Sequence, residues 1–314
     1  MYAIGIDIGG MSVKVGLVDG NGKIVFKNTR KTAQTAEELV KNAAEQIEDI
    51  LKGTSFTIKD IRGIGIGSPG IIDSKHGIVK AACNLPFTDF NIVKEFKKYF
   101  KTKIKVSNDA NVAALGETIF GCAHSYDNSV MFLLGTGVGG GIVIDRKLYE
   151  GGSSMGAELG HITLVEDGVP CNCGRKGCIE AYCSATALMR QTKEKMLEDK
   201  SSNMWQYVGG DIEKVSGLTA FDCEKTGDKS AREVVDNFVK HLSNAIMSMV
   251  NIFRPQAVIL GGGVSAQGEN LSKRVKEYCE KYDYGYAGTP KPEILIASLG
   301  NDAGIIGAAS LVLI

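Results

Sequence analysis

The sequence lacks the features of membrane-spanning and exported chains. It contains no apolar run of about eighteen residues, the length that an α-helix needs to cross a bilayer. Its first residues, from Met1 to Asp7, do not show a basic segment followed by an apolar segment and a cleavage site. From these two absences we expect a cytoplasmic protein that makes no membrane contact.

The sequence also lacks an excess of charge of either sign. Lys and Arg together number 36, as do Asp and Glu, so the formal net charge is zero. This balance argues against a general nucleic-acid binder. There is no linker or low-complexity segment, and a disulfide framework among the eight cysteines is not expected in the cytoplasm. At 314 residues the chain is too long for one typical core, so we expect two domains.

A short stretch rich in cysteine and glycine indicates a metal site. His161, Cys171, Cys173 and Cys178 lie within eighteen residues and supply the four ligands of a tetrahedral zinc site. Cysteines can instead be simple buried apolar residues, but this close spacing among glycines favours a metal. Because four protein ligands leave no position for water, the predicted zinc is structural.

Two carboxylates flank the predicted zinc site. Glu158 precedes His161 by three residues, and Glu180 follows Cys178 by two. Fixing the imidazole on a metal would hold both carboxylates rigidly over a ligand bound nearby. Glu180 also opens a long helix expected from Ile179 to Asp199, where its charge would interact favourably with the helix dipole.

Three glycine-rich turns follow strand-like segments. Gly9-Gly10 follows the first strand and could cradle phosphate oxygens, with Asp7 placed to hold hydrated Mg²⁺, although such a turn is also common in plain hairpins. The run from Gly135 to Gly141 joins two strands and lacks the Lys-Ser/Thr of a Walker loop, so it suits a phosphate-binding hairpin. Gly261-Gly262-Gly263 follows a buried strand and would let a flat ring approach the backbone closely.

Asp109 lies where a predicted strand meets a predicted helix. The strand from Lys103 to Val106 ends in Ser107-Asn108-Asp109, and a helix is expected from Ala110 to Phe120. Ligands of open α/β sheets bind at such junctions. Either Asn108 or Asp109 could instead be an ordinary helix N-cap, and this segment alone leaves both interpretations open.

The order of these motifs indicates a duplicated architecture. The strand that ends in Asp7 begins one three-strand meander, and the strand that ends at Gly135 begins another. The sequence therefore predicts an α/β protein in which two similar domains hold a nucleotide between their glycine loops.

Taken together, the motifs resemble those of the ROK family of repressors, open reading frames and kinases, within the sugar kinase/actin superfamily, and its glucokinase-like members most closely. The resemblance covers essentially the whole chain and all five superfamily motifs, which are Asp7–Gly10, Asp109–Glu117, Gly135–Gly141, Leu260–Ser265 and Gly304–Ala309. It implies a two-domain actin-like ATPase (ribonuclease H-like) fold with an interdomain cleft. The implied domains are residues 1–112 with the C-terminal helix 302–314, and residues 113–301 with the zinc site and adenosine motif.

The resemblance implies an ATP-dependent hexose kinase, most simply a glucokinase that forms glucose 6-phosphate, with Asp109 as the general base. A carboxylate within hydrogen-bond reach makes a sugar hydroxyl a better nucleophile by accepting its proton. The implied sugar contacts are Ser68, Asn84, Asn108, Asp109, Glu158, His161 and Glu180. The implied contacts to ATP and Mg²⁺ are Asp7, Gly9, Gly10, Ser12, Lys14, Gly135, Thr136, Gly137, Gly261, Gly262 and Gly263. A homodimer or homotetramer is expected from the family.

The sequence departs from the family at one position and leaves other acceptors open. Met11 stands where the family usually has Thr, so a hydroxyl contact to phosphate is lost or passes to Ser12. The acceptor could be fructose, mannose, N-acetylglucosamine or N-acetylmannosamine. A non-catalytic sugar sensor or repressor is a further alternative. A DNA-binding module before the strand that starts at Tyr2 is not expected, and Asp109 argues for catalysis.

Overall fold

A computed structural model describes residues 1–82, 85–285 and 288–314 and has a mixed α/β architecture. The chain divides into two compact units. Unit 1 contains Met1–Ser129, Gly141–Ala157 and Ser298–Ile314, and unit 2 contains Val130–Gly140 and Glu158–Ala297. No helix in the described residues is long and apolar enough to span a membrane.

The core of unit 1 is a five-stranded sheet with the order β3-β2-β1-β4-β8. Its strands are β1 (Tyr2–Ile8), β2 (Ser12–Asp19), β3 (Ile24–Lys31), β4 (Ile61–Ser68) and β8 (Ile104–Asn108). The first three strands form the predicted antiparallel meander, whereas β1, β4 and β8 are parallel to one another. The carboxyl ends of these three parallel strands therefore meet at one edge of the sheet.

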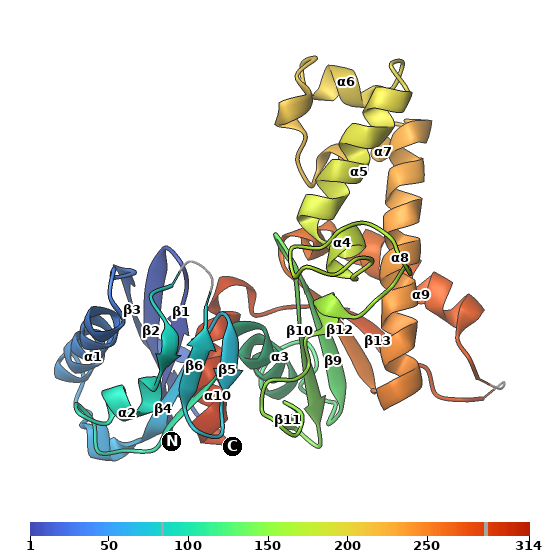
Figure 1. Cartoon of the computed structure of the whole chain (residues 1–314). Helices are drawn as coiled ribbons and strands as arrows, with labels where there is room; N and C mark the ends of the chain where they lie inside the picture. Colours follow the sequence, from blue (N-terminus) through green and yellow to red (C-terminus); the bar gives the residue numbers. More distant parts are fainter. Residues whose placement is uncertain (83–84, 286–287) are drawn as a thin grey trace. The chain divides into compact units, whose positions relative to one another are not determined.

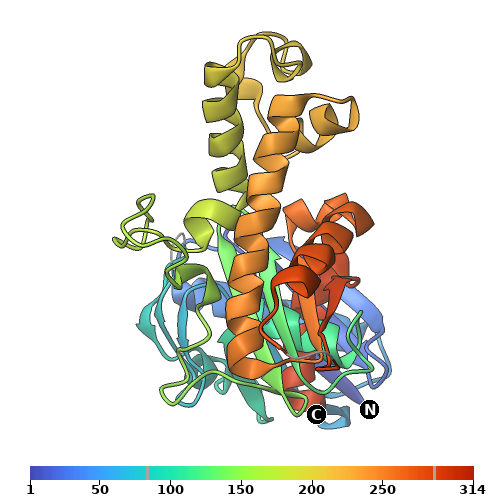
Figure 2. The ribbon, with the colours of Figure 1, turned by 90° about the vertical axis from the view of Figure 1, so that its right-hand side faces the viewer.

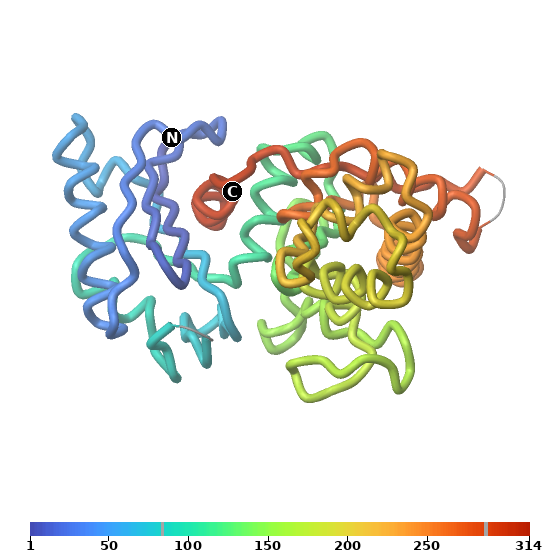
Figure 3. The backbone as a smooth tube through the Cα atoms, turned by 90° about the horizontal axis from the view of Figure 1, so that it is seen from above, coloured from blue at the N-terminus to red at the C-terminus, as the bar shows by residue number. Residues whose placement is uncertain are grey.

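Helices cover both faces of this sheet. They are α1 (Ala36–Lys52), α2 (Ile92–Phe96), α3 (Asp109–Ile119) and α10 (Ala303–Leu313), with the short 3-10 helices η1 (Ile58–Asp60) and η5 (Gly300–Asp302). α1 packs on β2 and β3, and α10 packs on β1 and β4 from the other side (Figure 3). The side chain of Thr35 caps α1 by accepting a hydrogen bond from the backbone N–H of Glu38.

A small antiparallel sheet in unit 1 was not expected from the sequence. It consists of β5 (Ile71–Asp73), β6 (Ile78–Ala81) and β7 (Thr88–Phe90) in the order β5-β6-β7. The sheet follows the turn after Ser68, where Gly70 has a φ of 103°. Strands of three or four residues carry too little alternation of apolar and polar positions to be recognised from sequence.

A second five-stranded sheet has the order β11-β10-β9-β12-β13, and most of its residues belong to unit 2. Its strands are β9 (Ser129–Leu134), β10 (Val138–Ile144), β11 (Lys147–Leu148), β12 (Ala257–Gly261) and β13 (Glu293–Ile296). Both large sheets thus place their five strands in the same order: third, second, first, fourth and fifth along the chain. This shared order confirms the duplicated architecture that the motifs predict.

The helices of unit 2 include a pair that stands side by side, α5 and α8 (Figures 1 and 2). The α-helices are α4 (Glu180–Cys183), α5 (Ala185–Glu198), α6 (Met204–Tyr207), α7 (Thr219–Lys225), α8 (Lys229–Phe253) and α9 (Glu269–Tyr282). The 3-10 helices are η2 (Leu159–His161), η3 (Ile212–Lys214) and η4 (Gly263–Gln267).

The prediction of a single helix from Ile179 to Asp199 was wrong, because Ser184 separates α4 from α5. Ser184 has an extended backbone, with φ of −80° and ψ of 163°, and its side chain caps α5 by accepting from the N–H of Ala187. The N–H of Ala185 donates instead to the carbonyl oxygen of Gly135 at 2.9 Å. A long-range backbone hydrogen bond therefore replaces the continuous helix at this point.

Helix α3 lies wholly in unit 1, which also contains residues 141–157. Gly116 of α3 lies against Gly307 of α10, where the absence of side chains lets the two backbones approach closely. The domain division and the interdomain cleft implied by the family resemblance stay predictions.

Candidate active site

Asp109 follows the carboxyl end of β8 and is the first residue of α3. The neighbouring residue, Asn108, is the N-cap of α3. The Oδ1 atom of Asn108 accepts from the N–H of Ala110 at 2.8 Å. The cap interpretation is therefore correct for Asn108. Asp109 Oδ1 also accepts from the N–H of Ala110, at 2.9 Å, and its carboxylate lies at the sheet edge. Burial raises the pKa of Asp109, and the nearby negative charge of Asp7 adds to this increase. Such a carboxylate accepts a proton more readily than an ordinary aspartate does.

Ser68 ends β4 opposite Asn108 in the parallel ladder. Its side chain is fully buried, and its Oγ donates to the carbonyl oxygen of Pro69 at 3.2 Å. Asn108 Nδ2 donates to the carbonyl oxygen of Gly70 at 3.1 Å, which fixes the turn after Ser68. The structure thus brings Ser68, Asn108 and Asp109 together, whereas Asn84 lies outside the described residues.

Asp7 lies at the end of β1, the strand next to β4. Lys14 Nζ donates to Asp7 Oδ2 at 3.0 Å from the facing position of β2. Gly304, in the first turn of α10, lies so close that an added Cβ would be 2.6 Å from the Asp7 carboxyl carbon. A carboxylate beside a helix N-terminus suits a hydrated Mg²⁺, because it is a hard oxygen ligand that the site fixes in place.

The Gly9-Gly10 turn is held by a residue that the sequence analysis did not identify. Thr32 Oγ1 donates to the carbonyl oxygen of Gly9 at 2.6 Å, and the N–H of Thr32 donates to the carbonyl oxygen of Met11 at 3.2 Å. The N–H of Gly9 donates to the carbonyl oxygen of Ser12 at 2.9 Å. The side chain of Met11 is 86% exposed, so it fills no part of the core.

Glu117 is a second residue that the sequence analysis missed. Its side chain is fully buried in α3, and its Oε1 accepts from the N–H groups of Ser298 and Leu299 at 2.8 and 2.7 Å. This segment leads to Asn301, whose carbonyl oxygen lies 3.5 Å from Lys14 Nζ. The carboxylate therefore anchors the loop beside Asp7. An acidic residue in the second half of α3, where most neighbours are small or apolar, was the available signal.

In unit 2, a glycine-rich loop joins β9 to β10 as predicted, but it consists only of residues 135–137, because residues 138–141 already belong to β10. Glu180 Oε2 accepts from the N–H of Val138 at 3.0 Å, and its carboxylate packs on the Cα of Gly137, where a Cβ would not fit. Thr186 Oγ1 donates to the carbonyl oxygen of Thr136 at 2.8 Å. Together with the Ala185–Gly135 hydrogen bond, these contacts fix the loop against the start of α5. The side chain of Thr136 remains exposed.

The four predicted metal ligands converge. The candidate ligand atoms of His161, Cys171, Cys173 and Cys178 all lie within 4.8 Å of one another. Cys173 Sγ and Cys178 Sγ are 3.6 Å apart, and Cys171 Sγ lies 3.8 Å from His161 Nδ1. A tetrahedral zinc with Zn–S bonds of about 2.3 Å separates two sulfurs by roughly 3.8 Å. These residues therefore fit a structural zinc ion, with His161 Nδ1 facing the sulfurs.

Two glycines let the backbone turn sharply between the cysteines of the cluster. Gly174 and Gly177 have φ values of 88° and 73°, in the left-handed region that favours glycine. Arg175 Nη1 donates to the carbonyl oxygen of His161 at 3.1 Å, a contact that the sequence analysis missed. Glu158 lies at the N-cap of η2 and is exposed, and its carbonyl oxygen accepts from the N–H of His161.

The turn after β12 contains the three glycines of the predicted adenosine motif. Gly262 has a φ of 84°, and an added Cβ would be 2.5 Å from the carbonyl oxygen of Leu134. Gly261 packs against the side chain of Met131, whereas a Cβ on Gly263 would meet no atom within 4 Å. Gly263 therefore leaves open space beside the backbone, where a flat ring could bind.

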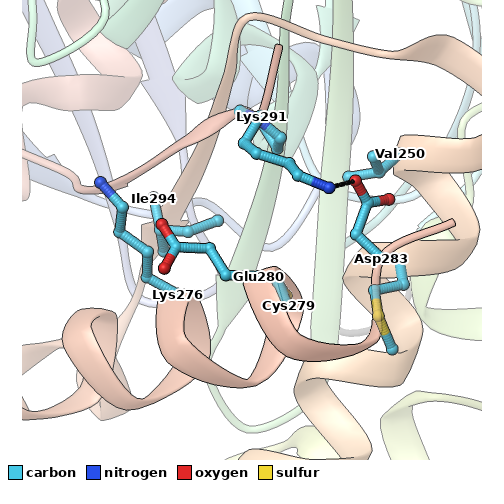
Figure 4. A pocket seen from close by; sticks show the side chains of 9 residues that line it. Val250, Lys276, Cys279, Glu280, Asp283, Lys291 and Ile294 are labelled. Atoms are coloured by element: carbon cyan, nitrogen blue, oxygen red, sulfur yellow. Dashed lines mark hydrogen bonds and ion pairs between the residues drawn. The ribbon is translucent and has the colours of Figure 1, made fainter. Parts of the chain in front are cut away.

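Unit 2 also contains a small pocket that includes none of the candidate active-site residues. It lies between α8, α9 and β13, and Lys291 points toward Asp283 at its rim (Figure 4). Its volume of about 10 Å³ accommodates one water molecule. Burial raises the pKa of the Cys279 thiol at its wall to about 11, so this cysteine is unreactive at neutral pH.

Known proteins resemble the chain over nearly its whole length. The ROK family profile matches residues 3–314. A glucokinase from Thermotoga maritima is 38% identical over 313 residues, which cover 98% of this chain and 96% of the relative. A ROK family glucokinase from Streptomyces griseus, solved with glucose and AMPPNP, is 32% identical with a TM-score of 0.80, and the match covers 99% of each chain.

A relative with a different name matches as well. A xylose repressor from Bacillus subtilis is 30% identical over 315 residues, which cover 99% of this chain and 77% of the repressor. Kinases and repressors thus share the fold described above. From the family match and from the arrangement of these motifs, we conclude that the chain belongs to the ROK family.

Proposed function

We propose that the protein is an ATP-dependent hexose kinase, with glucose as the first expected acceptor and glucose 6-phosphate as the product. The observation that carries this proposal is the Asp109 carboxylate, which lies at the shared edge of β1, β4 and β8 with its pKa raised by burial. The similarity to relatives named glucokinase supports it.

In the proposed reaction, Asp109 accepts the proton of the sugar hydroxyl. The hydroxyl oxygen then bonds to the γ-phosphorus of ATP as the bond between that phosphorus and ADP breaks. Asp7 would hold hydrated Mg²⁺, which would neutralise charge on the phosphates. Lys14 would contact the phosphate end of the nucleotide. Backbone N–H groups of Gly10, Thr136 and Gly137 would bind phosphate oxygens, whereas those of Gly9 and Gly135 donate within their own turns. The turn at Gly261–Gly263 would bind the adenosine.

The sugar would bind to side chains with several hydrogen-bonding atoms. The side chains proposed for this role are Asn108, Glu158, His161 and Glu180, together with the hydroxyl of Ser68. With His161 Nδ1 facing the cysteine sulfurs, Nε2 remains to contact a sugar hydroxyl. The zinc would keep the imidazole in this orientation without taking part in the chemistry.

A sugar-responsive repressor without catalytic activity is the second candidate, and the similarity to the xylose repressor favours it. Steady-state turnover distinguishes the two candidates. We expect ATP-dependent formation of a hexose phosphate, with glucose compared against fructose, mannose, N-acetylglucosamine, N-acetylmannosamine and xylose. Replacing ATP by GTP or polyphosphate tests whether Met11 alters the choice of donor. Sugar binding with no turnover for any pair of substrates would favour the repressor.

The proposed partners are small molecules and other copies of this chain. We expect a homodimer or homotetramer that binds neither nucleic acid nor membrane. Light scattering on the purified protein measures the mass directly. A mass of 33.5 kDa, that of one chain, at micromolar concentration would refute the oligomer.

A further inference from the structure

A cavity in unit 1 lies apart from the residues assigned to the proposed reaction. Its volume is about 740 Å³, within the range of pockets that bind small molecules. Its walls come from the edge strand β8, the turn between β5 and β6, residues 145–150, α3 and the end of α10. Apolar side chains, including Val106, Leu115 and Leu311, line part of it.

The wall of this cavity, here called the β8 groove, carries an excess of positive charge. Lys75, Lys105 and Lys147 stand beside two carboxylates, Asp145 and Glu150, which gives 3 − 2 = +1, whereas the charge of Arg146 is paired with Asp127. Within the described part of the chain, no hydrogen-bond or ion-pair partner is found for the ammonium groups of the three lysines. Desolvation lowers the pKa of Lys105, and the like charge of Lys103 adds to this effect. An anion in the groove would counter both effects.

Glu150 gives the groove a second kind of binding group. Its Oε2 accepts from Ser74 Oγ at 2.7 Å, and its Oε1 accepts from Ser107 Oγ at 2.6 Å. The carboxylate is thereby fixed in place, and each of its oxygens retains a lone pair for a further donor. A fixed carboxylate acceptor suits a ligand with hydroxyl groups, whereas the lysines suit an anion.

We propose that the β8 groove binds a small phosphorylated polyol, such as a sugar phosphate. Its phosphate would lie among Lys105, Lys147 and Lys75, and its hydroxyls would donate to Glu150. Lysine is well suited to phosphate because its ammonium group is a compact charge with three donors. A bare phosphate would fill only a small part of a cavity of about 740 Å³, so the ligand carries a larger body. The proposal does not require the kinase reaction.

The probe is glucose 6-phosphate, measured by calorimetry on the full chain with glucose and AMPPNP at saturating concentrations. These two ligands occupy the proposed active site, so that further binding of the probe reports on the β8 groove. We expect one additional molecule of glucose 6-phosphate per chain. Glucose alone should not bind there, and inorganic phosphate alone should bind more weakly, because each carries only half of the recognised chemistry.

The test variant is Lys105→Gln/Lys147→Gln, in which both changed side chains are exposed, so the fold should tolerate them. We expect its affinity for glucose 6-phosphate to fall at least tenfold. The control Lys41→Gln/Lys59→Gln removes the same charge from exposed positions outside the groove and should bind like the parent. No additional binding by the parent, or an equal loss in both variants, would overturn the proposal.

Failure of the proposed kinase function can be told apart from failure of the groove. If the protein does not bind glucose and AMPPNP, the same titration without them still compares the parent with the two lysine variants. A loss confined to Lys105→Gln/Lys147→Gln would then support the groove, and unchanged affinity in that variant would refute it.

Discussion

Glu180 Oε2 accepts a hydrogen bond from the backbone N–H of Val138, and the same carboxylate lies against Gly137. Its other oxygen, Oε1, is 3.6 Å from Cys171 Sγ. One side chain therefore links the glycine loop after β9 to the cysteine cluster. The family resemblance predicts a sugar contact for this residue, and the geometry adds a role in supporting the glycine loop.

Replacing Glu180 by Ala should therefore affect both substrates. The N–H of Val138, a residue that is only 6% exposed, would lose its acceptor, which costs about 1–3 kcal/mol. We expect KM for ATP and KM for glucose each to rise by roughly tenfold. Glu198→Ala, which removes an exposed carboxylate of α5, is the matched control and should change neither value. An increase confined to the KM of glucose would show that Glu180 does not support the loop.

The pH dependence of activity should reflect the environment of Asp109. Because burial and the charge of Asp7 raise its pKa, the carboxyl group should become protonated, and kcat/KM should fall, at a higher pH than an ordinary aspartate with a pKa of about 3.9 would allow. Asp7→Asn removes one cause of the increase, so its acidic limb should move to lower pH even though its turnover is reduced. A shift to higher pH in this variant would contradict the assignment.

Two neighbouring glycines offer a direct test of the turn after β12. Gly262→Ala should destabilise the protein, because alanine disfavours a φ of 84° and its Cβ would meet the carbonyl oxygen of Leu134. Gly263→Ala has open space around its Cβ, so its melting temperature should match that of the parent. KM for ATP should nevertheless increase in Gly263→Ala, because the methyl group would occupy the space proposed for the adenosine ring. An unchanged KM would place the nucleotide elsewhere.

One zinc ion per chain is expected in the protein as purified. Cys178→Ser should abolish the zinc measured by elemental analysis, and it should lower both the melting temperature and the affinity for glucose, because His161 would lose its fixed orientation. Cys223→Ser makes the same chemical change at a buried cysteine outside the cluster and should leave the zinc content at one. Parent protein that holds no zinc would contradict the metal site.

Features set by local chemistry were predictable from the sequence. Spacing and glycines predict the cluster around His161. The repeated meanders likewise predict the first three strands of each large sheet. These features depend on residues that are close together in sequence, where turn and helix preferences act directly.

Features set by distant contacts were not predictable. The division of the helix at Ser184 depends on the hydrogen bond from Ala185 to Gly135, some fifty residues earlier. Glu117 is recognisable as an anchor only when Ser298 and Leu299 lie beside it. The carboxylate of Glu150 likewise acquires its partners, Ser74 and Ser107, through the fold.

The central claim is that Asp109 accepts the proton of the sugar hydroxyl, and the turnover of Asp109→Asn tests it most directly. We predict that kcat falls by about 10²–10⁴-fold, while calorimetry still detects glucose binding within a few-fold of the parent. Because the folded state holds the pKa of Asp109 above its unfolded value, the ionised carboxylate weakens the fold at neutral pH. The melting temperature of Asp109→Asn should therefore be no lower than that of the parent, which excludes unfolding as the cause. A variant that turns over within a few-fold of the parent would contradict the account.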